Sequence, residues 1–352
     1  MHSLSPKFNV PANSSRFFEN YSEAVAQPTG KIHLVWNQND EIVVNQEFAS
    51  SLVKYDSAYC TSVSALGAKY SIPTFTYIEQ VLKFVRESPV VVDIGCGQGE
   101  FVCELRSRGI NAIGFDPVVR SINPFLHSKY WETSDTPGDL YVMRCVLPHI
   151  QNPWEFLTKI ANSSPQALVL IEFQSLEWIL EHKIWYQVSH DHVNLFSISD
   201  FYKRYRVVDS GTFSNGEWGW VLINPSDFRT PGSVISESYN QRFEELFAEK
   251  EVFLGNLAAI DRPIAIWGAA GKGIVLAYAC FSVCTQIFAI DADSHRWGRF
   301  LEASGTEVFS PSAVATLEKD SLVLVCNPNH LLEVKSFIGT DFEVKAPSEF
   351  KI

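Results

Sequence analysis

Two histidines that flank a carboxylate form the densest group of chemically active side chains in this sequence. His190, Asp191 and His192 lie within residues 185–197, in a chain with only 9 histidines. An imidazole near its ordinary pKa can take a carbon-bound proton when a neighbouring group stabilises the resulting enolate. In an extended segment the two histidines would face one way and Asp191 the other, whereas in a loop all three could converge.

Two other interpretations of this segment stay open. Imidazole and carboxylate are also metal ligands, but one cluster without a matching distant ligand makes a metal less favoured, so we expect none. Alternatively, the histidines only cap a loop and have a structural role.

A glycine-rich stretch at residues 90–99 predicts a ligand site. Its β-branched residues are typical of a buried strand that ends near Asp93, and a helix is expected from about Glu100 to Arg108. Between strand and helix, three glycines free the backbone to turn tightly against a ligand: Gly95, Gly97 and Gly99. The third glycine of a dinucleotide fingerprint would fall at Glu100, which argues against NAD.

A second acid supports a nucleoside-type ligand. Asp116, followed by Pro117, ends the next apolar run, where a carboxylate can accept hydrogen bonds from two ribose hydroxyls. A plain strand-to-helix turn and a solvated strand end are the alternatives. Together the two stretches resemble the first motifs of class I S-adenosylmethionine-dependent methyltransferases. The resemblance implies S-adenosylmethionine as cofactor, held by Asp93, Gly95, Cys96, Gly97, Gly99, Asp116 and Pro117.

The elements around these residues alternate between helix and strand. Apolar spacing predicts helices at 74–87 and 153–161 and strands at 139–147 and 166–171. Such alternation favours an α/β fold with a parallel sheet and helices on both faces. Before it we expect an irregular or loosely packed start up to about residue 30, then two short strands at 31–36 and 41–44.

The strand–helix rhythm restarts in the last third of the chain. Strands are predicted at 264–267, 287–290 and 322–326, which indicates a second, smaller Rossmann-like domain. The loop at 268–273 could present backbone N–H groups to phosphate, or be a tight structural turn. Because Gly273 stands where a phosphate loop has Ser or Thr, a nucleoside triphosphatase is not favoured. Residues 233–260 predict a long helix, either between the domains or packed on the first.

Composition limits the possible partners. The 352 residues are 46% apolar with a net charge of −12, so we expect a sizeable core and no nucleic-acid or membrane partner. No apolar run could span a bilayer and the polar start lacks a signal-peptide centre, so the default location is cytoplasmic. The 7 cysteines include no Cys-x-x-Cys pair and suggest neither disulfides nor zinc.

The chain after about residue 50 resembles one particular family, the bacterial nucleotide-sugar C-methyltransferases, which methylate C-3 of nucleotide-linked 4-keto-deoxysugars. The similarity follows the same order along the sequence: the glycine stretch, residues 146–157, residues 172–180, the His-Asp-His segment, the loop 268–273, Trp297-Gly-Arg299 and Asn327. The resemblance implies a short N-terminal domain (1–72), a cofactor domain (73–231), and a linker helix with a nucleotide-sugar-binding domain (232–352).

The resemblance also implies roles for individual residues. His192 is the expected base, with Asp191, His190 and Tyr59 as the other catalytic residues. The expected substrate-binding residues are Gly268, Gly271, Lys272, Arg299, Asn327, Ser189, Glu172 and His149. Two departures from the family bear on the substrate. The zinc-binding cysteines of its N-terminal domain are missing, and a family Tyr and Glu are replaced by Ser189 and Asp191.

The sequence therefore predicts an S-adenosylmethionine-dependent methyltransferase that C-methylates a nucleotide-linked keto-deoxysugar with His192 as base. Three alternatives remain: an O- or N-methyltransferase of a sugar or other metabolite, a nicotinamide oxidoreductase using residues 268–291, and a non-catalytic nucleotide-sugar binding module. The particular sugar, its nucleotide carrier, the stereochemistry and the oligomeric state are left open.

Overall fold

The computed structural model describes residues 2–56, 58–59, 65–83, 88–229, 237–284 and 286–351. Parts of two predicted helices lie outside these residues, namely positions 84–87 of the helix at 74–87 and positions 233–236 of the long helix. Positions 57 and 60–64, on either side of Tyr59, also lie outside them.

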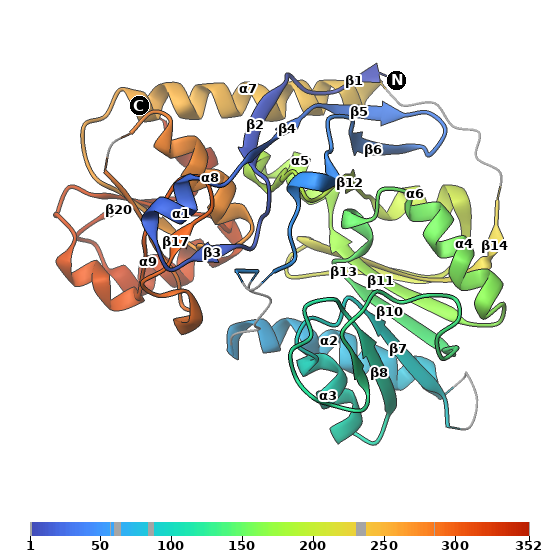
Figure 1. The fold of residues 1–352 in the computed structure, drawn as a ribbon. Helices are drawn as coiled ribbons and strands as arrows, with labels where there is room; N and C mark the ends of the chain where they lie inside the picture. The colour runs from blue at the N-terminus through green and yellow to red at the C-terminus, as the bar shows by residue number, and fades with distance from the viewer. Residues whose placement is uncertain are drawn as a thin grey trace.

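A seven-stranded central sheet has the order β13-β14-β11-β10-β7-β8-β9 (Figure 1). Its parallel strands are β7 (Val90–Ile94), β8 (Asn111–Phe115), β9 (Leu126–His127), β10 (Leu140–Arg144) and β11 (Leu168–Gln174). The antiparallel hairpin β13 (Tyr205–Phe213) and β14 (Trp218–Phe228) completes one edge. The predicted α/β architecture with a largely parallel sheet is confirmed.

Helices cover both faces of this sheet because its strands alternate their apolar side chains. Val91 packs with α2 (Ala65–Leu82) and α3 (Glu100–Ser107), whose apolar residues share its core cluster. Its neighbour Val92 belongs to the opposite core, with α4 (Pro153–Ser163) and α6 (Ile198–Arg204). Successive strand residues point to opposite faces, so a run of valines serves two cores at once.

The second, smaller Rossmann-like domain is a five-stranded parallel sheet of order β18-β16-β15-β19-β20. The strands are β15 (Ile264–Trp267), β16 (Ile287–Ile290), β18 (Val308–Phe309), β19 (Leu322–Val325) and β20 (Glu343–Lys345). Helices α8 (Lys272–Phe281) and α9 (Leu331–Ile338) accompany it. The three predicted strands correspond to β15, β16 and β19, whereas the sequence analysis did not predict β18 and β20.

The prediction of an irregular or loosely packed start is wrong. The first residues form β1 (His2–Ser3), β2 (Phe8–Pro11), β3 (Phe17–Phe18), α1 (Tyr21–Val25), β4 (Thr29–Ile32), β5 (Leu34–Asn37) and β6 (Ile42–Asn45). β3 pairs with β17 (Phe300–Leu301), and β6 pairs with β12 (Asn194–Leu195). Polar residues such as Asn13 and Ser14 are buried, because this segment crosses between the two larger sheets (Figure 1).

Helix α7 (Glu237–Ala258) runs along the top of the molecule in Figure 1, above the N-terminal strands and toward the C-terminal domain. Its buried side chains Phe243, Phe253 and Leu257 share one core with residues of both regions and of α5 (Leu176–Glu181). The helix therefore belongs to the core that joins these parts and not to either core of the central sheet.

Seven short 3-10 helices complete the described fold: Ser50–Leu52, Leu147–His149, Trp185–Gln187, Ser294–Arg296, Pro311–Thr316, Pro328–His330 and Pro347–Glu349. Among the described residues, no helix combines the length and the apolar character needed to cross a membrane.

Candidate active site and nucleotide pocket

The glycine-rich loop turns between β7 and α3 with all three of its glycines in the left-handed region, at φ values of 75°, 58° and 92° for Gly95, Gly97 and Gly99. The Gly95 N–H donates to the carbonyl of Phe115 at 2.8 Å, which ties the loop to the end of β8. A Cβ at Gly99 would lie 2.3 Å from a methyl carbon of Leu126. Side chains are therefore disfavoured here for reasons of both strain and space.

Asp116 closes the other side of this loop. Its two carboxylate oxygens accept N–H groups from Gly97 at 3.0 Å and from Val118 at 2.9 Å. Each oxygen keeps a further lone pair, so the carboxylate could also accept two hydroxyl groups. Burial raises the pKa of Asp116, and the two N–H donors partly offset that effect. Pro117 follows directly, and buried Cys96 packs beneath the loop against Gly114.

Asp93 is only 2% exposed within β7. Burial raises the pKa of its carboxyl to about 7, the Arg144 guanidinium opposes this shift, and Asp116 and Glu172 add to it. Three acids therefore lie close enough to interact at the carboxyl end of the sheet, a surrounding that favours a cationic ligand.

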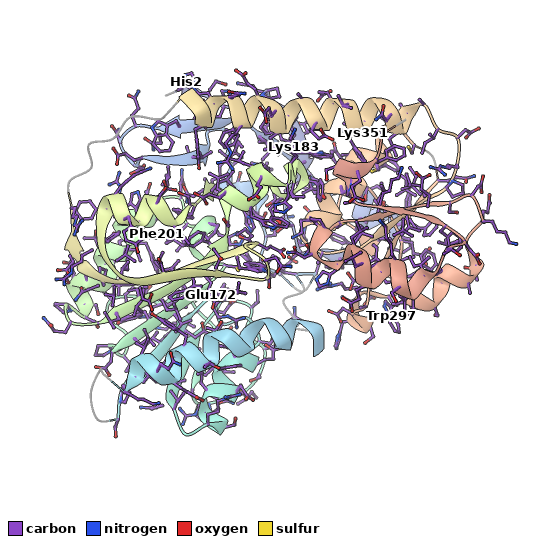
Figure 2. The ribbon with its side chains drawn as sticks, turned by 180° about the vertical axis from the view of Figure 1, so that it is seen from behind. His2, Glu172, Lys183, Phe201, Trp297 and Lys351 are labelled. Atoms are coloured by element: carbon purple, nitrogen blue, oxygen red, sulfur yellow. The ribbon has the colours of Figure 1, made fainter. Side chains whose placement is uncertain are left out.

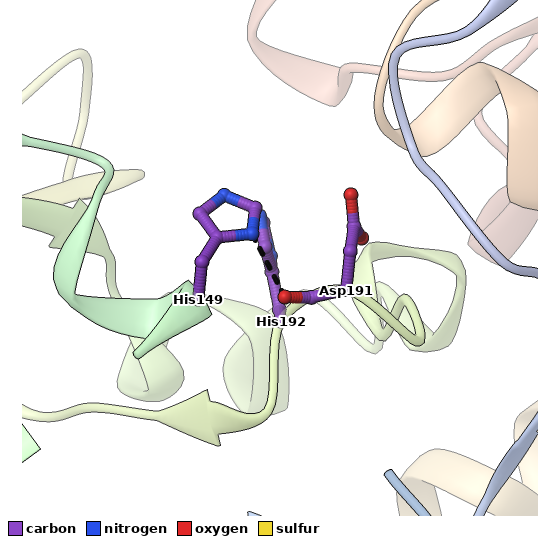
Figure 3. A group of neighbouring side chains, drawn as sticks. All are labelled: His149, Asp191 and His192. Atoms are coloured by element: carbon purple, nitrogen blue, oxygen red, sulfur yellow. Dashed lines mark hydrogen bonds between the residues drawn. The ribbon is translucent and has the colours of Figure 1, made fainter. Parts of the chain in front are cut away.

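The side chains of His149 and His192 lie next to each other, with Asp191 beside them (Figure 3). Their rings contact edge to face with centroids 4.5 Å apart, and His149 Nδ1–H donates to the backbone carbonyl of Asp191 at 2.8 Å. None of the described residues forms a hydrogen bond with the His192 ring. Burial and the neighbouring His149 lower the pKa of His192 to about 4, so its imidazole is neutral at neutral pH.

The Asp191 carboxylate lies on the other side of this pair and is held by Ser14. Its Oδ2 accepts the Ser14 backbone N–H at 3.0 Å and the Ser14 hydroxyl at 2.9 Å. Burial alone would raise the pKa of Asp191, but the two histidines, the Ser14 N–H and the Ser189 side chain outweigh it, and the net shift is downward. The acid is therefore ionised beside two imidazoles.

His149, Asp191 and His192 together could also hold a metal ion, since one ligand atom from each lies within 4.8 Å of the others. His149 is the distant ligand that the sequence analysis did not find. The hydrogen bond from His149 Nδ1 leaves its Nε2 as the free ring nitrogen when the imidazole is neutral.

Two tyrosines connect this group with the glycine-rich loop. Tyr55 and Tyr59 pack against each other with ring centroids 5.0 Å apart. Burial raises the pKa of both phenols, and the nearby charges of Asp191 and Asp116 raise it further. Both tyrosines therefore lie within electrostatic reach of the histidine segment and of the acid on the glycine-rich loop, and both stay protonated as hydrogen-bond donors.

His190 does not join the other predicted catalytic residues. Its Nδ1–H donates to the carbonyl of Lys31 at 3.0 Å, and its Nε2 accepts the N–H of Ala49 at 3.2 Å. The ring is fully buried and packs on Phe48 and against Gly30. With both nitrogens engaged by backbone, His190 holds the N-terminal strands in place. The chain bends at His190 and Asp191, and the two histidines contact different parts of the molecule.

Two predicted substrate-binding residues also lie away from the C-terminal domain. Ser189 is buried next to Asp191, with 2% of its surface exposed. Glu172, labelled in the central sheet in Figure 2, accepts hydrogen bonds from Thr74 and, at 3.1 Å, from Arg144. Both Glu172 oxygens are thus engaged by protein groups, and the charge of Glu172 contributes to the raised pKa of Asp93.

A cavity of about 650 Å³ opens at the carboxyl ends of the C-terminal strands. Four of the predicted residues line it: Gly268, Gly271, Lys272 and Asn327. Arg299 is not among the lining residues, whereas Arg296, three positions earlier, is. Arg296 donates to both oxygens of Asp291 at 3.1 and 3.0 Å, and exposed Trp297, at the domain's edge in Figure 2, donates to the Asp291 carbonyl at 2.7 Å.

Lys272 and Asn327 both bind a residue that sequence reasoning missed. Glu217, from the turn between β13 and β14, forms an ion pair with Lys272 and accepts the Asn327 amide at 2.9 Å. The lysine, Asn327 and Asn329 outweigh burial and lower the pKa of Glu217. This buried group links the central sheet to the C-terminal glycine loop. Neither Glu217 nor Ser14 belongs to a motif, so no local pattern could have revealed them.

Comparisons with known proteins match one family model and a set of solved structures. Residues 73–206 match the model of a methyltransferase domain. A protein from Pyrococcus horikoshii is 14% identical over 47% of this chain and 94% of its own, with a TM-score of 0.36. The mitomycin 7-O-methyltransferase MmcR is 20% identical over 46% of this chain and 55% of its own, with a TM-score of 0.33. An S-adenosylmethionine-dependent methyltransferase from Methanosarcina mazei is 16% identical over 41% of this chain and 95% of its own, with a TM-score of 0.30. No curated protein matches the sequence.

Likenesses at these TM-scores carry no argument about activity. The assignment rests on the family match, which spans the glycine-rich loop, Asp116 and the His-Asp-His segment, and on the geometry of that loop. Residues 73–206 are a class I methyltransferase domain, and the protein is an S-adenosylmethionine-dependent methyltransferase.

Proposed function

We propose that the protein transfers the methyl group to carbon, on a nucleotide-linked keto-deoxysugar, with His192 as the base. One observation carries the proposal: a buried, neutral His192 lies beside ionised Asp191, and two tyrosines lie within reach of both Asp191 and Asp116. A base, a nearby charge and hydroxyl donors are thus grouped within reach of the acid on the glycine-rich loop.

The residues around the glycine-rich loop fit the cofactor. Asp116 retains lone pairs for the ribose hydroxyls, and the three acids of this region suit a cationic sulfonium and ammonium. We assign cofactor binding to Asp93, Gly95, Cys96, Gly97, Gly99, Asp116 and Pro117. When bound there, S-adenosylmethionine supplies an electrophilic methyl group.

The proton step needs a neutral imidazole and a stabilised enolate. A 4-keto group makes the proton on C-3 acidic. The C–H bond breaks, its proton moves to the free ring nitrogen of His192, and its electron pair shifts to the ketone oxygen. Asp191 favours the imidazolium that forms. The Tyr59 hydroxyl, kept protonated by burial, is the proposed donor to the enolate oxygen.

The C-terminal cavity is the proposed site of the nucleotide. Trp218 and Trp267 among its lining residues offer flat faces for a base, and the lining guanidinium of Arg296 suits a diphosphate. The helix α8 begins at this cavity, so its N-terminal dipole adds to the attraction for anions.

The test is mass spectrometry of nucleotide-linked 4-keto sugars incubated with the enzyme in deuterated water, with and without S-adenosylmethionine. We expect deuterium at C-3 without the cofactor and a methyl group on carbon with it. His192→Asn should lose both signals and still bind S-adenosylmethionine. The control His182→Asn, at the C-terminal end of α5, should retain both. Methylation of oxygen would overturn the assignment to carbon, and turnover by His192→Asn would overturn the base.

A further inference from the structure

Residues 12–18 form a buried strap between the catalytic segment and the C-terminal domain. Within it, Ala12, Asn13 and Ser14 are 0%, 1% and 6% exposed. The strap ends in β3, which pairs with β17 of the C-terminal part of the chain. A polar segment this deeply buried must have its hydrogen-bonding groups satisfied by specific partners.

Ser14 contacts both neighbours of the strap at once. Its N–H and its hydroxyl donate to Asp191 Oδ2 at 3.0 and 2.9 Å, and its carbonyl accepts the N–H of Gly271 at 2.8 Å. Gly271 belongs to the loop that lines the C-terminal cavity. One residue therefore connects the acid beside the proposed base with the glycine loop of the other domain.

The strap on either side of Ser14 is firmly anchored. The Asn13 side chain exchanges hydrogen bonds with the backbone of Lys54, at 3.3 and 3.2 Å. Arg16 forms a two-pronged ion pair with Asp56, with its shorter contact at 2.7 Å. Because both flanks are fixed, the position of the Ser14 hydroxyl is set by the fold and not by Asp191.

We propose that Ser14 is a positioning residue for catalysis, which holds the Asp191 carboxylate at a fixed distance from His149 and His192. The inference rests on the proposed function of His192. The other Asp191 oxygen, Oδ1, is buried and has no hydrogen-bond partner by distance and angle among the described residues, although the neighbouring Ser189 side chain helps to lower the pKa of Asp191. The side-chain hydrogen bond that fixes the position of this carboxylate is therefore the one from Ser14. Without the hydroxyl, the carboxylate can rotate, and its charge then stabilises the imidazolium of His192 less well.

Ser14→Ala removes the hydroxyl and keeps both backbone hydrogen bonds. We expect a fall in kcat of about tenfold, as for the loss of one hydrogen bond to a charged group, with KM for the sugar and affinity for S-adenosylmethionine unchanged. Ser14→Thr, which retains the hydroxyl, should restore kcat. Asn13→Ala is the matched control: it loosens the same strap at Lys54, so it should lower the Tm but not kcat.

A titration that needs no substrate separates this proposal from the proposed function. In Ser14→Ala, the pKa of Asp191 followed by NMR of labelled carboxyl carbons should rise, because a donor to its ionised form is lost. The other titratable groups that face Asp191 are His149, His192, Tyr55, Tyr59 and Glu302. An unchanged Asp191 titration, or an equal loss of kcat in Asn13→Ala, would overturn the role of Ser14. A raised pKa in a protein that methylates no keto sugar would refute the proposed function alone.

Discussion

Each Rossmann-like domain contains a unit in which a glycine loop joins a strand to a helix and a second strand follows. The two units share their backbone arrangement. In β7 to β8 and in β15 to β16, the first loop glycine donates its N–H to the carbonyl of the last residue of the second strand. Gly95 bonds Phe115 and Gly268 bonds Ile290, both at 2.8 Å. The chain thus uses the same turn twice.

An acid follows the second strand in both units and makes equivalent bonds. Asp116 accepts one N–H from its glycine loop and one from two residues downstream, at 3.0 and 2.9 Å. Asp291 accepts the corresponding pair at 2.7 and 2.8 Å. Backbone geometry therefore does not distinguish the two sites.

Side chains make the difference. Asp291 also binds the Arg296 guanidinium, and α8 begins with Lys272. In the first unit α3 begins with Glu100, and no described residue forms an ion pair with Asp116. The Asp116 carboxylate thus stays available for neutral hydroxyls, whereas that of Asp291 is occupied by a cation. The same backbone arrangement therefore leaves the carboxylate of Asp116 with only N–H donors, whereas that of Asp291 also binds a guanidinium.

Replacing Lys272 should have the largest effect. Lys272→Met leaves the carboxylate of Glu217, whose side chain is 3% exposed, without its cation. Breaking one partner of a buried ion pair costs about 3–5 kcal/mol, so calorimetry should show a clear fall in Tm. The matched change Glu100→Met, at the exposed first position of α3, should alter stability by less than about 0.5 kcal/mol.

A companion variant sharpens this result. Adding Glu217→Gln to Lys272→Met removes the uncompensated charge, so it should restore most of the lost stability. If Lys272→Met and Glu100→Met had similar Tm values, the ion pair would not join the hairpin to the C-terminal loop in solution.

The two acids should differ in their effect on cofactor binding. Asp116→Asn replaces an ionised acceptor of the ribose hydroxyls with an amide, so affinity for S-adenosylmethionine should fall about 30-fold, equivalent to about 2 kcal/mol. Asp291→Asn should leave that affinity unchanged, since its carboxylate binds Arg296. Isothermal titration calorimetry measures both. Equal losses in the two variants would mean that the cofactor site is misassigned.

The smallest expected effect is a dependence of cofactor affinity on pH. Because burial raises the pKa of Asp116, its carboxylate is protonated at a higher pH than that of an ordinary aspartate. Affinity should therefore begin to fall above the usual value of about 3.9, by about threefold when a third of the carboxylate remains ionised. The comparison is made in an Asp93→Asn background, which removes the titration near 7. Asp116→Asn should abolish the remaining dependence.

Much of the fold could be predicted because its signals are local. The valines of β7, the glycines that follow and the acid after β8 are fixed by strand propensity, by the need for positive φ and by position at a strand end. The same reasoning located β15, β16 and β19. It failed for the first thirty residues, whose polar composition suggested a loose segment. Their burial depends on partners elsewhere in the chain, such as Asp191 and Glu302.

The sequence by itself determined the glycine-rich turns, the acid at the end of the second strand and the presence of a histidine and acid in one short segment. Tertiary structure alone decided which of these side chains meet. His149 joins His192 across 43 positions of sequence, by the difference of their numbers, while adjacent His190 turns away to bond Lys31 and Ala49. Ser14 reaches Asp191, and Glu217 reaches Lys272. Such contacts join segments that no local pattern connects, because they form only where separate elements pack around a common buried charge.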